Sequence, residues 1–229
     1  MKLLLRPYFL SVLMAFLLVG LPALCQKSPS FEEVLSLSSI YGAQISPDGQ
    51  HIVYHQTTTD WENNRYDREL WITKNGGAPF QLTNNPDGSS TSAQWSPDGQ
   101  WIGFLSQRGD HTQIHVMRSA GGEAFAYTDI DGDVSGFQWS PDGAQIAFLR
   151  SEDKKEEQKK RKDKYGAFAV DDQEYAQRQL WLMPFDVDRI NEIVTPQSAE
   201  DSTWKASRKP TRVMEDGAFS IMSFSWSPD

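Results

Sequence analysis

The tetrapeptide Ser46-Pro47-Asp48-Gly49 recurs at 96–99 and 140–143, and a fourth copy begins at 227–229 without its glycine. A motif that returns at intervals of about 45 residues indicates a repeat architecture, in which each repeat is one supersecondary unit. The first two intervals are 50 and 44 residues long, and the third is 87. Because the fourth copy lacks its glycine, we expect the polypeptide to be cut off within a repeat.

The residues on both sides of each tetrapeptide alternate between apolar and polar, which is the period of a half-buried β-strand. The preceding segments are 43–45, 93–95, 137–139 and 224–226. The following apolar pairs are Ile52 and Tyr54, Ile102 and Phe104, and Ile146 and Phe148. Proline favours the second position of a type I turn, and glycine accepts the positive φ that follows. Each tetrapeptide is therefore predicted to join two strands in a tight hairpin.

A second pair of strands is predicted in each repeat, at 70–73 and 80–83, at 114–117 and 125–128, and at 180–183 and 190–195. Four short strands in about 45 residues are typical of a β-propeller blade. We therefore predict an all-β fold, a partial β-propeller of four-stranded blades within residues 41–229. Three blades are expected at about 41–83, 91–128 and 135–195, and the next blade at 221.

The long third interval could contain a degenerate extra repeat or a single blade with two insertions. We favour insertions at 152–177 and 196–220, because two gaps between strand segments are each about twenty residues longer than in the preceding repeat. The first insertion would join the second and third strands, and the second would lead to the next blade. These two connections emerge at the same end of an up-and-down blade, so both insertions are predicted to project from one face.

The first 25 residues have the three-part pattern of a secretory signal peptide. Lys2 and Arg6 precede an apolar run at 8–21, which is followed by the small residues Ala23 and Cys25. We expect cleavage after Cys25 and a secreted or periplasmic protein. The alternative is a lipoprotein that keeps a lipidated Cys25.

A leader at 26–40 is predicted to contain a short helix before the first blade. Ser30 would be its N-cap and Glu33 would complete a capping box. The apolar face would be formed by Val34, Leu35, Leu37 and Ile40.

The composition is acidic and excludes several functions. The formal net charge is −9, and the signal segment contains two basic residues and no acidic one, so the rest of the chain carries −11. This charge argues against binding nucleic acid, which needs a basic surface. No membrane span is expected after signal cleavage. Cys25 is the one cysteine, so the mature chain would have no disulfide, thiol nucleophile or cysteine metal site.

The repeated Trp-Ser-Pro-Asp-Gly, followed by spaced Ile and Phe, resembles the TolB-type propeller repeat. The leader at 31–37, which runs into 44–49, and the segments 164–168 and 171–175 before 180–181 are more specific. They are similar to the N-terminal propeller of prolyl-oligopeptidase-type serine peptidases, in the branch of acylaminoacyl and dipeptidyl peptidases. The similarity extends over nearly all of the chain after residue 25.

The resemblance implies a secreted serine peptidase as the parent protein. In that family an α/β-hydrolase domain follows the propeller and carries a Gly-x-Ser-x-Gly nucleophile, then Asp and His. No Gly-x-Ser-x-Gly occurs in this chain, so no catalytic residue is assigned and the chain alone should be inactive. The propeller would gate or position a peptide substrate for the missing domain, with no cofactor. The alternative is a non-catalytic TolB-like binding module of the cell envelope. The substrate-binding residues and the oligomeric state stay unassigned.

No metal site is predicted. His51 and His55, like His111 and His115, are four residues apart, but on strands this spacing spans about 13 Å, too far for one metal ion. The acidic segment 129–133 suggests a calcium loop but lacks the later glutamate, so a simple turn is the better interpretation.

Surface roles have few candidates. The charged run 152–164 is interpreted as a solvated segment in preference to a substrate-gating edge. Glu156 and Glu157 lack the aromatic context of the glutamate pair with which dipeptidyl-peptidase propellers hold an amino terminus, so that role is not transferred. Trp61 and Trp204 lie outside the repeat and are therefore better candidates for a surface role than the repeated tryptophans. The repeated tryptophans are predicted to be core: Trp95, Trp139 and Trp226.

Overall fold

The structure, a computed structural model, describes residues 28–86, 88–151, 160, 163–166, 177–186, 190, 209–214 and 219–227. The chain divides into two units, Met1–Leu37 and Ser38–Asp229. In the first unit, helix α2 (Phe31–Leu35) has the predicted capping box. The Glu33 N–H donates to Ser30 Oγ at 3.1 Å, and the Ser30 N–H donates to the Glu33 carboxylate at 2.6 Å. The helix is shorter than the predicted leader, and Ile40 belongs to the first strand.

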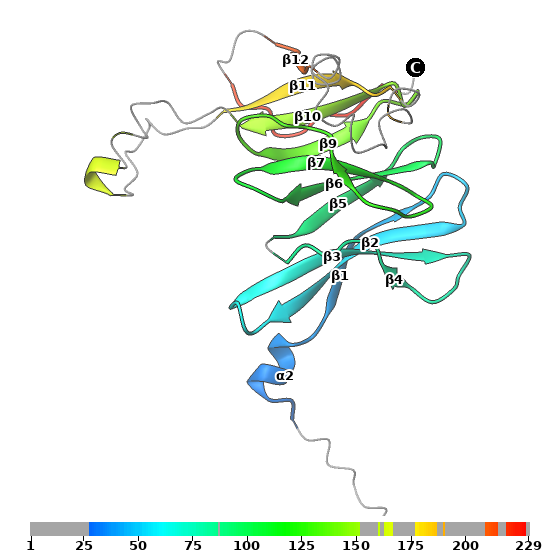
Figure 1. The fold of residues 1–229 in the computed structure, drawn as a ribbon, viewed down its shortest axis with the longest axis vertical. Coiled ribbons are helices and arrows are strands. Elements are labelled where there is room, and N and C mark those ends of the chain that lie inside the picture. Colours follow the sequence, from blue (N-terminus) through cyan, green and yellow to red (C-terminus); the bar gives the residue numbers. More distant parts are fainter. Residues whose placement is uncertain are drawn as a thin grey trace, which may run out of the picture. The chain divides into compact units, whose positions relative to one another are not determined.

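The described residues of the second unit form three four-stranded antiparallel sheets, each in up-and-down order (Figure 1). Blade 1 consists of β1 (Ser39–Ile45), β2 (His51–Asp60), β3 (Arg65–Lys74) and β4 (Phe80–Gln81). Blade 2 consists of β5 (Ser90–Trp95), β6 (Trp101–Gln107), β7 (Thr112–Arg118) and β8 (Phe125–Ala126). Blade 3 consists of β9 (Val134–Trp139), β10 (Gln145–Ser151), β11 (Arg178–Pro184) and β12 (Thr211–Arg212). The predicted all-β fold, a partial propeller, is confirmed.

The tetrapeptides form the predicted hairpin turns. In blade 2 the Gly99 N–H donates to the Ser96 carbonyl oxygen at 2.9 Å, and Gly99 has a φ of 70°. Glycine adopts this left-handed conformation without the steric cost of a Cβ. The other two turns repeat this geometry, with φ of 73° at Gly49 and 72° at Gly143.

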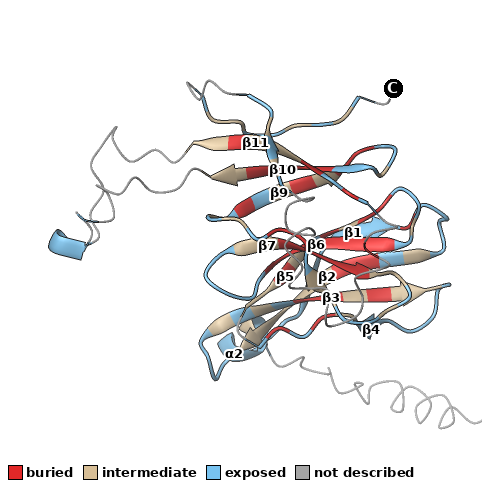
Figure 2. Ribbon diagram, turned by 45° about the horizontal axis from the view of Figure 1, so that its top comes forward, coloured by how far each residue is buried: buried red, intermediate tan, exposed pale blue. Residues whose placement is uncertain are grey.

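The core lies between the blades, where the sheets face one another (Figure 2). One buried cluster joins blades 1 and 2 and contains Val53, Leu70, Ile72, Ala93, Trp95, Ile102, Phe104 and Met117. A larger cluster joins blades 2 and 3, with Trp101 and Ile114 from one blade and Trp139 and Phe148 from the other among its members. Blade 2 is covered on both faces, which is why β6 has six consecutive buried residues.

The fourth strand of blade 3 is not where the sequence pattern placed it. The predicted strand 190–195 begins with Ile190, which lies in a helical turn and donates its N–H to the Asp186 carbonyl oxygen at 3.1 Å. Ile190 is 1% exposed and belongs to the core cluster. Residues 191–208 lie outside the described residues, and β12 is the strand that pairs with β11. An apolar residue that fills the core from a helical turn was mistaken for a strand residue.

The position of β12 also corrects the predicted placement of the insertions. The connection at 152–177 joins β10 to β11, as expected, but the second long connection joins β11 to β12. These connections start from opposite ends of β11, because a connection enters at one end of a strand and leaves at the other. The two long connections are therefore attached at opposite ends of blade 3, and not at the same end as predicted.

Candidate functional site

The connections between strands gather at two ends of the sheets. One end, which we call the turn end, carries the tetrapeptide turns and the connections between third and fourth strands. Within blades 1 and 2, these two kinds of connection are hydrogen-bonded to each other. The Asn75 N–H donates to the Gln50 carbonyl oxygen, and the Ser119 N–H to that of Gln100, each at 2.9 Å. The opposite end, which we call the loop end, carries the connections between second and third strands and the connections from one blade to the next. Because its loops differ from blade to blade on a repeated scaffold, the loop end is the candidate functional surface.

The hairpin of β2 and β3 is braced at the loop end. Each of its strands has ten residues, whereas β6 and β7 have seven. The Asp60 carboxylate accepts from the Asn63 N–H at 3.1 Å and from Arg65 Nε at 3.2 Å. Arg65 also donates to the Pro86 carbonyl oxygen in the loop between blades. Trp61 lies at this braced tip and is 53% exposed, so it remains the candidate for a surface contact.

The acidic segment 129–133 is held by neighbouring residues of blade 2. The side-chain amide of Gln113 donates to the carbonyl oxygens of Ile130 at 2.9 Å and Gly132 at 3.2 Å. The Asp133 carboxylate accepts from the Thr112 N–H at 2.7 Å. Three oxygens of this segment thus have protein donors as partners, and their geometry is that of a loop folded onto β7.

The histidine pairs have partners other than one another. His51 stacks on Trp95 with ring centroids 6.3 Å apart, and His55 stacks on Tyr41 at 5.7 Å. His111 Nδ1 lies 3.9 Å from the Asp133 carboxylate, whereas His115 stacks on Phe104 inside blade 2. Among the described residues, no group of three or more His, Cys, Asp or Glu side chains could hold a metal ion.

His115 is the most strongly perturbed titratable group of the described residues. It is 4% exposed on β7, and this burial lowers its pKa from 6.5 to about 4. A hydrogen bond with the Gln113 backbone opposes the shift, and Arg108 adds to it. Burial also lowers the pKa of His55, with Arg68 contributing. Both rings are therefore neutral at pH 7, as expected for histidines packed in a sheet rather than exposed for acid–base chemistry.

The aspartates of the turn end stabilise their own turns. Ser46 Oγ donates to Asp48 Oδ1 at 2.5 Å, and the Gln50 N–H donates to the same oxygen at 3.0 Å. Hydrogen bonds to a carboxylate favour its charged form, so the pKa of Asp48 lies below its ordinary value. The pKa of Asp142 is lowered in the same way by the Ser140 hydroxyl.

Glutamine and tryptophan side chains connect the first strands of successive blades. Trp95 Nε1 donates to the Gln44 carbonyl oxygen at 3.2 Å, from blade 2 to blade 1. The side-chain amide of Gln94 donates to the Phe137 carbonyl oxygen at 2.7 Å, from blade 2 to blade 3. These contacts were not predicted from the sequence, although a glutamine precedes the last strand residue in all three copies, at 44, 94 and 138.

The same two contacts connect blade 3 to segment 221–227. The Gln138 amide donates to the Phe224 carbonyl oxygen at 3.3 Å, and Trp226 Nε1 donates to the Gln138 carbonyl oxygen at 3.5 Å. This segment, which leads into the fourth copy of the repeat, therefore lies beside β9 as β9 lies beside β5.

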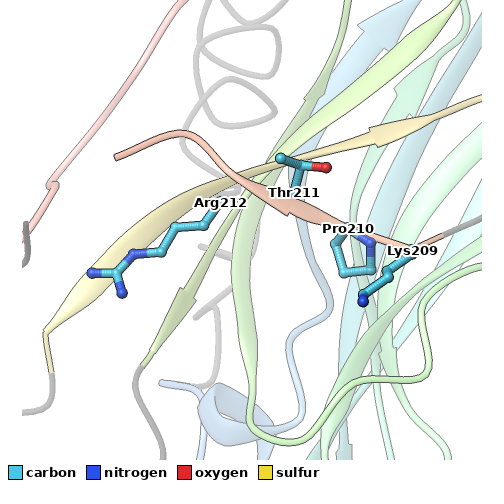
Figure 3. A pocket seen from close by; sticks show the side chains of 4 residues that line it. All are labelled: Lys209, Pro210, Thr211 and Arg212. Atoms are coloured by element: carbon cyan, nitrogen blue, oxygen red, sulfur yellow. The ribbon is translucent and has the colours of Figure 1, made fainter. Parts of the chain in front are cut away.

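A shallow hollow of about 530 Å³ adjoins β12 (Figure 3). Its described lining consists of Lys209, Pro210, Thr211 and Arg212. The lining offers two cationic groups and one hydroxyl but no carboxylate, imidazole or thiol. These four residues could accept an anionic group, and they do not include a nucleophile or a general base for catalysis.

Several residues singled out in the sequence lie outside the described residues. They are Glu156, Glu157, Trp204 and most of 152–164. In the part of the chain that is described, no helix is long and apolar enough to cross a membrane.

The four-stranded blades and the hydrogen-bonded turns at the turn end define a β-propeller protein. Residues 27–170 match the family model described as the TolB beta propeller domain, and the chain belongs to this family. The uncharacterized peptidase YuxL of Bacillus subtilis (strain 168) is 35% identical over 103 residues, 43% of this chain and 15% of that protein. Dipeptidyl-peptidase 5 of Porphyromonas gingivalis is 28% identical over 83 residues, 36% of this chain and 12% of that protein. The chain thus matches less than a sixth of each relative's length.

Solved structures share the fold at low sequence identity. The acylaminoacyl peptidase of Pyrococcus horikoshii superposes with a TM-score of 0.51 and 15% identity, over 68% of this chain and 24% of that chain. The AtxE2 isopeptidase superposes with a TM-score of 0.52 and 14% identity, over 72% and 33%. Together with the named relatives, these matches confirm the resemblance to the propellers of prolyl-oligopeptidase-type peptidases.

Proposed function

We propose that this chain is the N-terminal propeller portion of a secreted serine peptidase of the prolyl-oligopeptidase type. The observation that carries the proposal is the 35% identity to a peptidase over 103 residues. The hydrolase domain that would supply the serine, aspartate and histidine is not encoded in these 229 residues. The parent would hydrolyse peptides by acyl transfer through such a triad.

In this proposal the propeller admits and positions peptide substrates. To restrict entry to the active site to small or unfolded peptides, a propeller needs a rigid scaffold that carries loops at one end. The packed blades would be that scaffold, and the loop end carries the loops. Its hairpin at Trp61 is fixed by Asp60 and Arg65, so it can hold a constant position beside a neighbouring domain. The acidic charge of the chain makes peptides a more suitable partner than nucleic acid.

The proposed location follows from the signal-like segment 1–25. N-terminal sequencing of the exported protein should begin at Gln26. A blocked N-terminus with a fatty acyl mass on Cys25 would support the lipoprotein alternative instead.

The test begins with the coding sequence beyond residue 229. We expect Gly-x-Ser-x-Gly and then Asp and His within a few hundred residues, and hydrolysis of short fluorogenic peptides by the full product. A stop codon after a few more blades, or a full product without peptidase activity, would contradict the proposal. The 229-residue chain is the matched control and should be inactive.

The second candidate is a non-catalytic TolB-like module that binds a protein or glycan in the cell envelope. The match to the TolB beta propeller domain favours it, because that match describes the repeat and not an activity. Retention of an envelope partner by a gene product that lacks a hydrolase domain would support this candidate.

A further inference from the structure

The turn between β3 and β4 contains Asn75-Gly76, the one Asn-Gly pair in the chain. Asn75 has a φ of 52° and Gly76 a φ of 67°, and the Gly77 N–H donates to the Lys74 carbonyl oxygen at 2.8 Å. Two successive positive φ angles closed by this bond define a type I′ turn, for which Asn-Gly is a preferred sequence. Asn75, Gly76 and Gly77 are all exposed, so water has access to the pair.

The backbone nitrogen of Gly76 is open to reaction with the Asn75 side chain. Its N–H has no hydrogen-bond acceptor among the described residues, and a Cβ atom added to Gly76 would meet nothing within 4 Å. Closure of a ring between the two residues requires the turn to leave its type I′ shape. The strand after the turn, β4, has two residues, both exposed, and pairs with β3 at these two positions alone. A short, exposed strand pairing opens at a low cost in free energy.

Asn64, in the turn between β2 and β3, shows which feature of the pair matters. It is exposed and has a φ of 50°, close to that of Asn75. The residue after it is Arg65, which pairs with Asp60 at the start of β3 and whose Nε donates to the Asp60 carboxylate at 3.2 Å. The nitrogen after Asn64 therefore belongs to a paired residue with a bulky, fixed side chain. The nitrogen after Asn75 belongs to a glycine, which has no side chain to hinder its approach.

The tetrapeptide turns contain Asp-Gly pairs, but their aspartates are protected from the same ring closure. The Asp48 carboxylate accepts from Ser46 Oγ and from the Gln50 N–H, and these bonds lower its pKa. Asp142 is held in the same way by Ser140. Because these hydrogen bonds keep the carboxylates ionised, their carbon atoms resist attack by a nucleophile. The neutral amide of Asn75 has no such protection.

We propose that Asn75 is a site of spontaneous deamidation through a cyclic imide formed with Gly76. The Gly76 nitrogen attacks the Asn75 side-chain carbonyl carbon, and a bond forms between these two atoms. The bond from that carbon to Nδ2 breaks, and the amide group leaves as ammonia with the proton from the Gly76 nitrogen. Water then hydrolyses either carbonyl of the imide, which gives aspartate or isoaspartate at position 75. Water is the sole co-reactant, and the reaction is independent of the proposed peptidase function.

Both products change the contact between two turns of blade 1. The Asn75 N–H donates to the Gln50 carbonyl oxygen at 2.9 Å, beside the turn that contains the charged Asp48. Each product adds a carboxylate next to this turn, and like charges repel. Isoaspartate also adds one carbon to the main chain and so lengthens the turn that the bond from Gly77 to Lys74 closes. We therefore expect β4 to be less firmly paired after the reaction.

The test follows the uptake of heavy oxygen by the folded full gene product. The protein is incubated at mildly alkaline pH in water labelled with ¹⁸O, and its peptides are analysed by mass spectrometry, so that only deamidation during the incubation carries the label. A synthetic peptide of residues 70–81 sets the rate without folded structure. Asn75 should react within about tenfold of the peptide rate, because the turn opens without global unfolding. Asn64, the matched internal control, should react at least about tenfold more slowly than Asn75.

Gly76→Ala should slow the reaction at Asn75 at least about tenfold, since the added methyl group hinders attack by the nitrogen. Electron-transfer fragmentation should detect isoaspartate at position 75, a product that direct hydrolysis of the amide does not give. An unlabelled Asn75 after the synthetic peptide has reacted completely would overturn the proposal, and so would equal labelling of Asn64. Labelled aspartate without isoaspartate would overturn the route through the cyclic imide.

Discussion

Trp95 Nε1 donates a hydrogen bond to the Gln44 carbonyl oxygen across the boundary between blades 1 and 2, at 3.2 Å. Trp139 has the same repeat position and similar burial, but its Nε1 has no hydrogen-bond partner among the residues that the structure describes. The two tryptophans are therefore a natural pair for measuring what the inter-blade bond contributes.

Trp95→Phe should destabilise the chain by about 1 kcal/mol more than Trp139→Phe, because only the first substitution removes an existing hydrogen bond, the one from Trp95 Nε1 to the Gln44 carbonyl oxygen. Both remove a similar area of buried ring. The measurement is the free energy of unfolding by urea denaturation. Equal losses for the two variants would show that the bond adds nothing to the inter-blade contact.

Gly103→Ala should destabilise the interface of blades 2 and 3 by about 1–3 kcal/mol, the usual cost of overpacking. A Cβ atom at Gly103 would lie 2.9 Å from Phe137 and 3.1 Å from Trp139. Gly136→Ala on β9 is the control, because a Cβ atom there meets nothing within 4 Å. Thermal unfolding of both variants checks the prediction, and a neutral Gly103→Ala would mean that the blades are less closely packed than the structure has them.

These packing relationships mark the limit of what could be predicted from the sequence. The tetrapeptides predicted the hairpins and the first two strands of each blade, because Pro and Gly impose the turn locally. The fourth strands are two residues long and depend on pairing with the third strand, so β12 had no local pattern of its own. Ile190 was misplaced because an apolar residue has the same appearance in a strand and in a buried turn. Glutamine contacts such as Gln94 to Phe137 depend on the tertiary arrangement of blades.

Stability should fall as the pH is lowered through the range set by His115. Its folded pKa is about 4 and its ordinary value is 6.5. In the unfolded chain the His115 ring therefore becomes protonated as the pH falls below 6.5, whereas in the folded chain it stays neutral down to about pH 4. Linkage gives a loss of about 3 kcal/mol between pH 6.5 and 4.

His115→Phe should remove most of this dependence on pH, although the lowered pKa of His55 leaves a smaller slope. Unfolding free energies measured at several pH values test the prediction, with the ring titration of His115 followed by NMR. A midpoint near 6.5 for that ring would contradict the buried, neutral histidine.

The Asp48 carboxyl should titrate below 3.8, because Ser46 Oγ donates to it. A lowered carboxyl pKa stabilises the turn above the ordinary pKa, and this contribution is lost as the pH falls through the folded value. Ser46→Ala should move the midpoint up towards 3.8, as observed by carboxyl ¹³C NMR. Ser140→Ala should do the same for Asp142 and leave Asp48 unchanged. If the titration midpoint of Asp48 is the same in Ser46→Ala as in the unchanged chain, the Ser46 hydroxyl is not the cause of the lowered pKa.

The most direct test of the peptidase proposal is labelling with a fluorophosphonate, which reacts with the activated serine of a triad. The full gene product should be labelled on one serine encoded after residue 229, and the 229-residue chain, which has no Gly-x-Ser-x-Gly, should stay unlabelled. Absence of label on the folded full product, or label on a serine of the 229-residue chain, would contradict the proposal that this chain is the propeller of a serine peptidase.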